Sequence, residues 1–354
     1  MDRLAEIDGA AGGGQMLRSA VALSAVSGRP VRITNIRGAR PQPGLRPQHL
    51  TAVQAAARVC SGAVSGAEIG SREIEFRPGP IASQPDLRLD IGTAGSVTLV
   101  LQCLLPALAH APTRSALTLI GGTDVPFAPP FGYFQHVFAP ALAVLGPRVE
   151  ARLAQRGFYP RGGGEVSVAV NPSPILPSLQ WLDRGRVVRV RVRGCAASLG
   201  LPDHIVRRMR DAALAALRKC GTDDIGVEAE VAAAGAGEGC GIALWAECEG
   251  GLRFGGSALG RRGKRAEEVG EEAARALLSE LRGAAAVDSH LADQLIVWLA
   301  LAAGPSEFTT SRLTDHLRSA CQVADAVVGA RFELTEGPPA RVRCHPSPSS
   351  SRPV

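Results

Sequence analysis

The sequence is poor in several residue types and patterns, and each shortage excludes a class of protein. Of its 354 residues only 4% are aromatic, and only Lys219 and Lys264 are lysines. The eight cysteines are scattered without a C-x-x-C pair, so neither a zinc knuckle nor a disulfide framework is predicted. The longest apolar run, Ser96 to Ala111, is interrupted by polar residues and proline, and is shorter than the roughly 20 residues that span a bilayer. We therefore predict no membrane association.

The remaining composition is that of a folded protein, with 45% hydrophobic and 20% charged residues. The length favours two domains or one large one. A net charge of +6 favours an anionic partner such as a polynucleotide. The base composition of the coding sequence explains an arginine-rich chain equally well. The first residues lack a basic segment followed by an apolar one, which predicts a cytoplasmic protein.

Glycine-led helices that alternate with short β-branched runs predict an α/β fold. A helix is expected after the glycines at 12–14, and a strand follows from Val31 to Ile36. A glycine turn precedes an expected helix again at 92–95, and more loosely at 121–122. The echo suggests repeated units of mixed structure.

Three prolines between Asn171 and Asp183 break the regular pattern and suggest a domain boundary. We predict a discontinuous large domain over 1–182 and 259–336, with a smaller α/β domain inserted at 183–258. The Pro- and Ser-rich end, 337–354, is expected to be a flexible tail.

Two segments have the chemistry of phosphate sites. Backbone N–H groups of a glycine turn that opens a helix converge on one point, so the turn at 12–14 suits an anion, although most such turns only reverse the chain. The following loop carries Arg37, Arg40 and Arg46 on a backbone stiffened by proline. These guanidiniums could clamp phosphoryl oxygens, or form a solvated basic loop.

Two histidines and one acidic pair have unusual surroundings. His290 precedes Asp293 and Gln294, which lie in an otherwise apolar helix, and a buried Asp requires a partner unless the helix exposes that face. His316 opens a helix, where the helix dipole favours a neutral, nucleophilic imidazole.

The stretch RGFYPRGGGEV, from Arg156 to Val166, resembles the signature of the RNA 3′-terminal phosphate cyclases. Other blocks are similar to that family in the same order, namely DGAAGGGQMLRSA, RGARPQPGLRPQHLTAVQAA, GAEIGS, TAGSVTLVLQ, GGTDVPFAPP, GSALGRRG and HLADQLIVWLALA. The resemblance covers about Ile7 to Glu336. It implies a large domain of three repeated α/β units, like that of the enolpyruvyl transferases, with a small inserted domain.

The resemblance also implies ATP-dependent conversion of an RNA 3′-terminal phosphate into a 2′,3′-cyclic phosphodiester. An active-site histidine takes AMP from ATP, AMP passes to the RNA 3′-phosphate, and the neighbouring 2′-OH displaces it. Adenylation supplies a leaving group that a phosphomonoester lacks, and proximity favours attack by the 2′-OH. The implied partners are ATP, a divalent metal (Mg or Mn) and RNA with a 3′-phosphate, and family members are often homodimers.

Mapped onto this sequence, the family's nucleophile is His316. The residues implied to bind the nucleotide are Gln102, Phe127, Pro129, His290, Asp293 and Gln294. Those implied to lie near phosphates or the RNA end are Arg18, Arg37, Arg40 and Gln48.

The glycine turn departs from the family pattern. The family usually has D-G-x-x-G-E-G-G-G-Q, whereas the segment from Asp8 to Gln15 is two residues shorter and lacks the glutamate associated with the metal. We expect reduced metal affinity, unless Asp8 or Asp293 substitutes or the metal is held chiefly by phosphates and water.

Two other functions compete with the cyclase. A non-catalytic cyclase-like protein that associates with RNA and assists ribosome assembly would lack the nucleophilic histidine, so His316 favours the enzyme, while the missing glutamate favours this rival. An enolpyruvyl transferase would share the large domain, but RGFYPRGGGE and LADQL argue against it.

Overall fold

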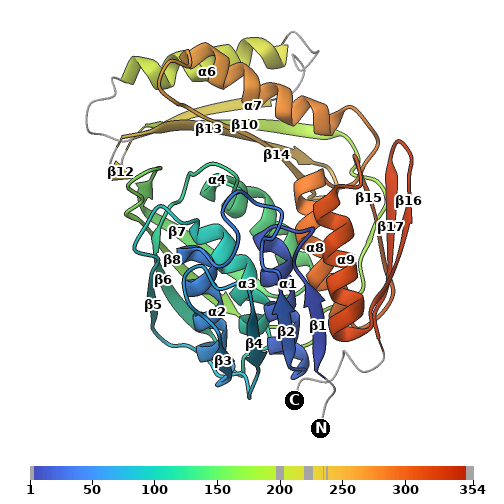
Figure 1. The fold of residues 1–354 in the computed structure, drawn as a ribbon. Helices are drawn as coiled ribbons and strands as arrows, with labels where there is room; N and C mark the ends of the chain where they lie inside the picture. Colours follow the sequence, from blue (N-terminus) through green and yellow to red (C-terminus); the bar gives the residue numbers. More distant parts are fainter. Residues whose placement is uncertain (1–3, 197–202, 219–225, 234, 237, 348–354) are drawn as a thin grey trace.

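Three small sheets with the same connectivity make up most of the molecule, seen here in a computed structural model (Figure 1). The structure describes residues 4–196, 203–218, 226–233, 235–236 and 238–347. Each sheet follows the order strand, helix, strand, helix, strand, strand, with its first two strands parallel and its last two antiparallel. This shared pattern confirms the predicted α/β fold of repeated units. In the sequence, the glycine turns are the only sign of the repeat.

The bounds of the repeated elements are as follows. The first unit contains β1 (Ala5–Asp8), α1 (Gly14–Ser27), β2 (Val31–Thr34), α2 (Pro47–Val59), β3 (Ala63–Ser65) and β4 (Ile74–Arg77). The second contains β5 (Leu87–Asp90), α3 (Val97–Ala109), β6 (Ser115–Gly121), α4 (Phe131–Tyr133), the π-helix η1 (Phe134–Phe138), α5 (Ala139–Val144), β7 (Arg148–Gly157) and β8 (Gly164–Asn171). The third contains β9 (Gln180–Trp181), α8 (Ser289–Ala300), β15 (Ser306–Thr310), α9 (Asp315–Val328), β16 (Arg331–Thr335) and β17 (Ala340–His345).

The sheets form the outside of this large unit, and apolar helices lie between them (Figure 1). Strands such as β2 alternate buried and more exposed side chains, which places one face of each sheet against the core. Helix α3 is buried along its whole length except at Gln102. A long polar side chain that stays partly exposed on such a helix indicates that this position faces a cavity rather than the core.

A fourth sheet is inserted between β9 and α8 of the third unit. Its elements are β10 (Val187–Ala196), α6 (Asp203–Arg218), β11 (Gly226–Ala233), β12 (Gly235–Ala236), β13 (Cys240–Cys248), β14 (Arg253–Leu259) and α7 (Ala266–Leu281). The sheet order is β11-β10-β13-β14, and β12 instead extends the second unit's sheet by pairing with β7. Helices α6 and α7 cover one face of the inserted sheet, and its other face is turned toward the large unit (Figure 1).

Two predicted boundaries are wrong. Helix α7, predicted to belong to the large domain that resumes at 259, packs on α6 and β14 through Val269, Ala273 and Leu277, so the boundary at 258 falls too early. The predicted flexible tail at 337–354 includes β17, which pairs with both β15 and β16. Residues 348–354 lie outside the described residues. Within the described part of the chain, no helix is long and apolar enough to cross a membrane.

Asp288 ties the inserted sheet to the large unit. Its buried carboxylate accepts hydrogen bonds from the Tyr133 hydroxyl (2.7 Å), the Gly255 amide of β14 (3.0 Å) and the Leu291 amide of α8 (2.8 Å). It therefore caps α8 while it joins the second unit, the third unit and the insert at one point. Burial raises the pKa of Asp288, an effect that the hydrogen bonds from Tyr133 and Leu291 offset in part.

Candidate functional site

A pocket of about 370 Å³, part of it open to solvent, lies where α1, α3 and α8 meet. Its lining is Gln15, Arg18, Ser19, Gln102, Phe138, Asp293, Gln294, Val297 and Trp298. Four of the residues predicted to bind nucleotide or phosphate, which come from three different units, are thus brought together: Arg18, Gln102, Asp293 and Gln294. Six of these nine side chains are polar, so the pocket offers a ligand hydrogen-bonding groups as well as apolar contact with Phe138, Val297 and Trp298.

The two glutamines of the pocket orient one another. The Gln102 side-chain amide donates to Oε1 of Gln294 (2.7 Å), and Nε2 of Gln294 donates to the carbonyl of His290 (2.9 Å). The chain of hydrogen bonds fixes both amides, which leaves the Gln102 carbonyl oxygen as an acceptor for a ligand. His290 itself is exposed at the start of α8, with its ring edge-on to Tyr133 at a centroid distance of 6.3 Å.

Asp293 connects the pocket to α9. It is only 9% exposed, and its Oδ1 accepts a hydrogen bond from the Thr314 hydroxyl, which in turn caps α9 by accepting from the Leu317 amide (3.0 Å). Burial raises the pKa of Asp293 to about 6, against the opposing effect of the Thr314 hydrogen bond. Asp293 therefore positions the first turn of the helix that carries His316.

His316 lies exposed in that first turn. Its backbone carbonyl accepts from Nε2 of Gln15 (3.2 Å), which ties the start of α9 to α1. Partial burial lowers the pKa of His316, and the positive charges of Arg18 and Arg40 lower it further. The imidazole is therefore neutral near pH 7, which is the state a nitrogen nucleophile requires.

The first turn of α1 is a cluster of donors without acidic residues. The N-cap, Gly13, has no side-chain cap, so its N–H groups are available to an anion. A Cβ on Gly13 would lie 3.1 Å from Nη2 of Arg40, and one on Gly14 would lie 3.1 Å from Nη1 of Arg18. Burial lowers the pKa of Arg18 to about 10, and its buried Nε has no hydrogen-bond partner among the described residues. An orphaned guanidinium N–H beside a free helix start indicates an anion site.

His49 belongs to this cluster, although it is not among the predicted site residues. Its imidazole is 3% exposed, and Nδ1 accepts the Arg46 backbone N–H at 3.1 Å. Burial and the nearby Arg18 lower the pKa of His49 to about 3, so the ring is neutral, and this hydrogen bond assigns its proton to Nε2. Nε2 faces the glycine turn, because a Cβ on Gly14 would lie 2.1 Å from it.

Four other predicted residues lie outside the pocket lining, and their predicted roles stay predictions. Nη1 of Arg37 donates to the carbonyls of Gln42 and Gly44, so this guanidinium holds its own loop. Gln48 accepts from the Ser96 amide at the start of α3 (2.8 Å). The remaining two are Phe127, which is fully exposed, and Pro129, whose carbonyl accepts from the Thr98 hydroxyl (2.8 Å).

The described residues do not fit a metal held by the protein. Oδ1 of Asp8 accepts from the Ala10 amide (2.9 Å) and from Nδ2 of Asn35 (3.1 Å), so it is used to close its own turn. Asp293 is engaged by Thr314. Across the described ranges, no three His, Cys, Asp or Glu side chains are grouped as ligands for a metal ion. The donors that the cluster offers to a phosphate are guanidinium, imidazole and backbone N–H groups.

The raised pKa of Asp293 predicts a stability cost at neutral pH. The folded protein holds this proton more tightly than the unfolded chain, so stability is lost as pH rises from about 4 through about 6. Asp293→Asn keeps an acceptor for Thr314 and removes the titration. Between about pH 5 and about pH 8 its free energy of unfolding should gain about 1 kcal/mol on wild type.

Denaturant unfolding at both pH values measures this difference. Asp325→Asn, which changes an exposed carboxylate on the same helix α9 as Thr314, is the matched control. A difference between Asp293→Asn and wild type that is the same at both pH values contradicts the prediction.

Comparison with known proteins shows the family. The family model described as RNA 3′-terminal phosphate cyclase matches residues 10–334. The chain is 43% identical over 328 residues to the RNA 3′-terminal phosphate cyclase of Pyrobaculum neutrophilum, covering 93% of each chain. It is 42% identical over 345 residues to that of Nitrosospira multiformis, covering 96% of each. A solved enolpyruvyl transferase, NikO from Streptomyces tendae, aligns with 98% of this chain and 66% of its own at 13% identity and a TM-score of 0.27. The chain belongs to the RNA 3′-terminal phosphate cyclase family.

Proposed function

We propose that this protein uses ATP to convert the 3′-phosphate of RNA into a 2′,3′-cyclic phosphodiester. The observation that carries the proposal is the position of His316, whose backbone carbonyl accepts a hydrogen bond from Gln15, a residue that lines the pocket together with Arg18. Partial burial and the charges of Arg18 and Arg40 lower the pKa of its exposed imidazole. A neutral nucleophile next to a cationic cluster suits attack on phosphorus. The relatives that match more than nine-tenths of the chain are named for this reaction.

In the first step, an imidazole nitrogen of His316 attacks the α-phosphorus of ATP. The P–N bond forms as the bond to pyrophosphate breaks, which leaves AMP on the histidine. The nearby Arg18, with its orphaned Nε, and the amides of the glycine turn stabilise the negative charge that develops on the phosphoryl oxygens. His49 adds a neutral N–H donor at the same turn.

In the second step an oxygen of the RNA 3′-phosphate attacks the AMP phosphorus and displaces His316. The 2′-OH of the same ribose then attacks the 3′-phosphorus, its proton is lost and AMP leaves. Arg18 and Arg40 hold the 3′-phosphate beside the nucleotide, so both transfers occur between groups already in position. RNA with a 3′-phosphate is thus the proposed substrate.

The adenosine part of ATP is proposed to occupy the pocket between α1, α3 and α8. The oriented Gln102 and Gln294 present fixed polar groups, and Oδ2 of Asp293 is left to accept from a ligand hydroxyl. Phe138, Val297 and Trp298 supply the apolar walls. A divalent metal, if it accompanies ATP, is proposed to be held by phosphates and water, and a homodimer stays a prediction from the family resemblance.

His316→Ala should abolish transfer of AMP to the protein. Wild type incubated with α-labelled ATP and magnesium or manganese should carry acid-labile label, because a phosphoramidate is cleaved by acid, whereas the variant should carry none. His204→Ala, an exposed histidine on α6, is the matched control and should label like wild type. Folded wild type that takes up no label would favour the non-catalytic RNA-associated alternative.

Arg40→Gln should shift the pH dependence of that first step to higher pH. The Arg40 charge lowers the pKa of His316, so its removal raises that pKa and leaves less neutral imidazole in mildly acidic solution. Single-turnover labelling from about pH 5 to about pH 8 measures the midpoint. Arg58→Gln, an exposed arginine on α2, is the control. An unchanged midpoint in Arg40→Gln with a slower plateau would mean that Arg40 acts only on the phosphates.

A further inference from the structure

Two large aromatic side chains are exposed on adjoining loops of the second unit. Phe127 is 103% exposed in the loop after β6, and Tyr159 is 67% exposed in the loop between β7 and β8. The loops are neighbours, because Asp124 and Phe158 form a parallel β-bridge and the Asp124 amide donates to the carbonyl of Gly157 (3.2 Å). In a protein with 4% aromatic residues, two rings that are exposed on neighbouring loops instead of being used in the core require an explanation.

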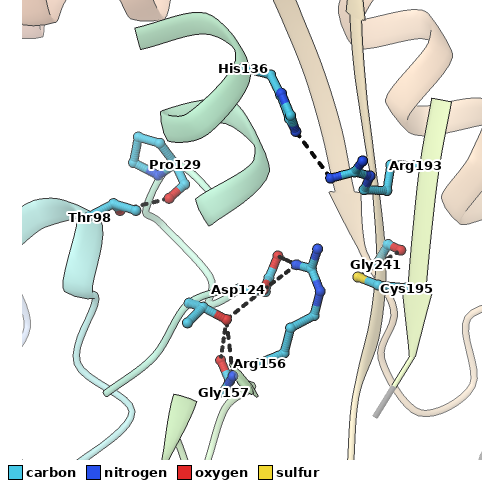
Figure 2. A network of polar contacts seen from close by, with 10 residues as sticks. Thr98, Asp124, Pro129, His136, Arg156, Gly157, Arg193, Cys195 and Gly241 are labelled. Atoms are coloured by element: carbon cyan, nitrogen blue, oxygen red, sulfur yellow. Dashed lines mark hydrogen bonds and ion pairs between the residues drawn. The ribbon is translucent and has the colours of Figure 1, made fainter. Parts of the chain in front are cut away.

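Buried polar contacts hold both loops rigidly (Figure 2). Nη1 of Arg156 binds both oxygens of Asp124, at 3.0 and 2.8 Å, and the pair is nearly excluded from solvent. The Thr123 hydroxyl donates to Asp124, and the Gly157 amide donates to Thr123 (3.0 Å). A buried ion pair that is supported by further hydrogen bonds fixes the geometry of the backbone that carries it.

The backbone at Phe127 is held in an unfavourable conformation. Its φ is +63°, a region that a bulky side chain rarely adopts, and Pro126 and Pro129 flank it in sequence. The hydrogen bond from Thr98 to the Pro129 carbonyl anchors the far side of the loop (Figure 2). Strain that the surroundings maintain, on a ring that makes no core contact, indicates a ring presented for binding.

The two loops lie beside the site. Thr98, which anchors the Phe127 loop, is one helical turn before Gln102 on α3, and Gln102 lines the pocket. The Tyr159 loop approaches the same helix start, because a Cβ on Gly162 would lie 2.7 Å from the Thr93 carbonyl. Arg161, which lies between Tyr159 and Gly162 in the sequence, is exposed and forms no ion pair among the described residues.

We propose that Phe127 and Tyr159 stack on bases near the 3′ end of single-stranded RNA, while Arg161 meets its phosphate backbone. The inference rests on the proposed function. It adds to that function the site that binds the RNA strand next to its reacting 3′ end. Separate rings beside a cation suit splayed nucleotides rather than a protein partner, which would need a continuous apolar patch. Because every base has a π-face, such stacking binds RNA ends without selecting a sequence.

Equilibrium binding tests the proposal without ATP. The probe is a labelled RNA of about six nucleotides with a 3′-phosphate, followed by fluorescence anisotropy. Tyr159→Ala and Phe127→Ala should each weaken binding about tenfold. Tyr159→Phe and Phe127→Trp retain a ring and should bind nearly like wild type. Thermal unfolding of each variant separates lost contacts from lost fold.

A double-mutant cycle identifies the contact. The same RNA is prepared with abasic riboses at its last two positions, and each alanine variant is measured on both RNAs. If the rings stack on these bases, alanine costs little further affinity on the abasic RNA. Equal losses on both RNAs, or no loss on either, overturn the proposal.

The result is independent of the proposed catalysis. Failure of wild type to label with ATP would remove the cyclase reaction yet leave the stacking measurement intact, because binding is recorded without turnover. Conversely, the protein could take up label from ATP while alanine at Phe127 and Tyr159 leaves its RNA affinity unchanged. That result would retain the cyclase function and reject stacking of RNA bases on the two rings.

Discussion

The close approach of His49 to Gly14 sets the geometry of the anion site. An added Cβ at Gly14 would lie 2.1 Å from Nε2 of His49 and 3.1 Å from Nη1 of Arg18, so only glycine lets both groups reach the start of α1. Because the imidazole is buried with a pKa lowered to about 3, it adds a donor without adding a charge. The full charges on this face are then guanidiniums, which add to the effect of partial burial in lowering the pKa of His316. Because Gly14 has no side chain, there is room at the start of α1 for both the anion site and the nucleophile beside it.

The three-unit architecture explains why the site lies where it does. Each unit contributes one buried helix to the centre, and the pocket opens where those helices meet, with Arg18 on α1, Gln102 on α3 and Asp293 on α8. No single unit could enclose a ligand, since each sheet and its helices bury only one face. The Asp293–Thr314 hydrogen bond then joins α8 to the start of α9, because Thr314 is the N-cap of that helix. Ligand contacts on α8 and the nucleophile on α9 are therefore placed relative to each other by one short connection.

Much of this arrangement could be predicted from the sequence, and the failures have specific causes. Helices such as α9 are recognisable from periodicity and caps, and the family motifs indicated four residues that line the pocket. Periodicity shows that α7 is amphipathic, yet it cannot say whether its apolar stripe faces the inserted or the large core. Strand β17 is difficult to recognise in the sequence because proline and serine are frequent around it, although its buried and exposed positions alternate. His49 could not be ranked above the other histidines, because its role depends on contact with a glycine 35 positions earlier in the chain.

The shortened glycine turn changes how phosphate charge is met. The first turn of α1 has no acidic residue, because the glutamate expected from the family resemblance is missing. Oδ1 of Asp8 accepts hydrogen bonds from Ala10 and Asn35. An acidic side chain here would add a negative charge close to the arginines that, after partial burial, lower the pKa of His316. The start of α1 instead has only neutral and positively charged donors, which suit an anion.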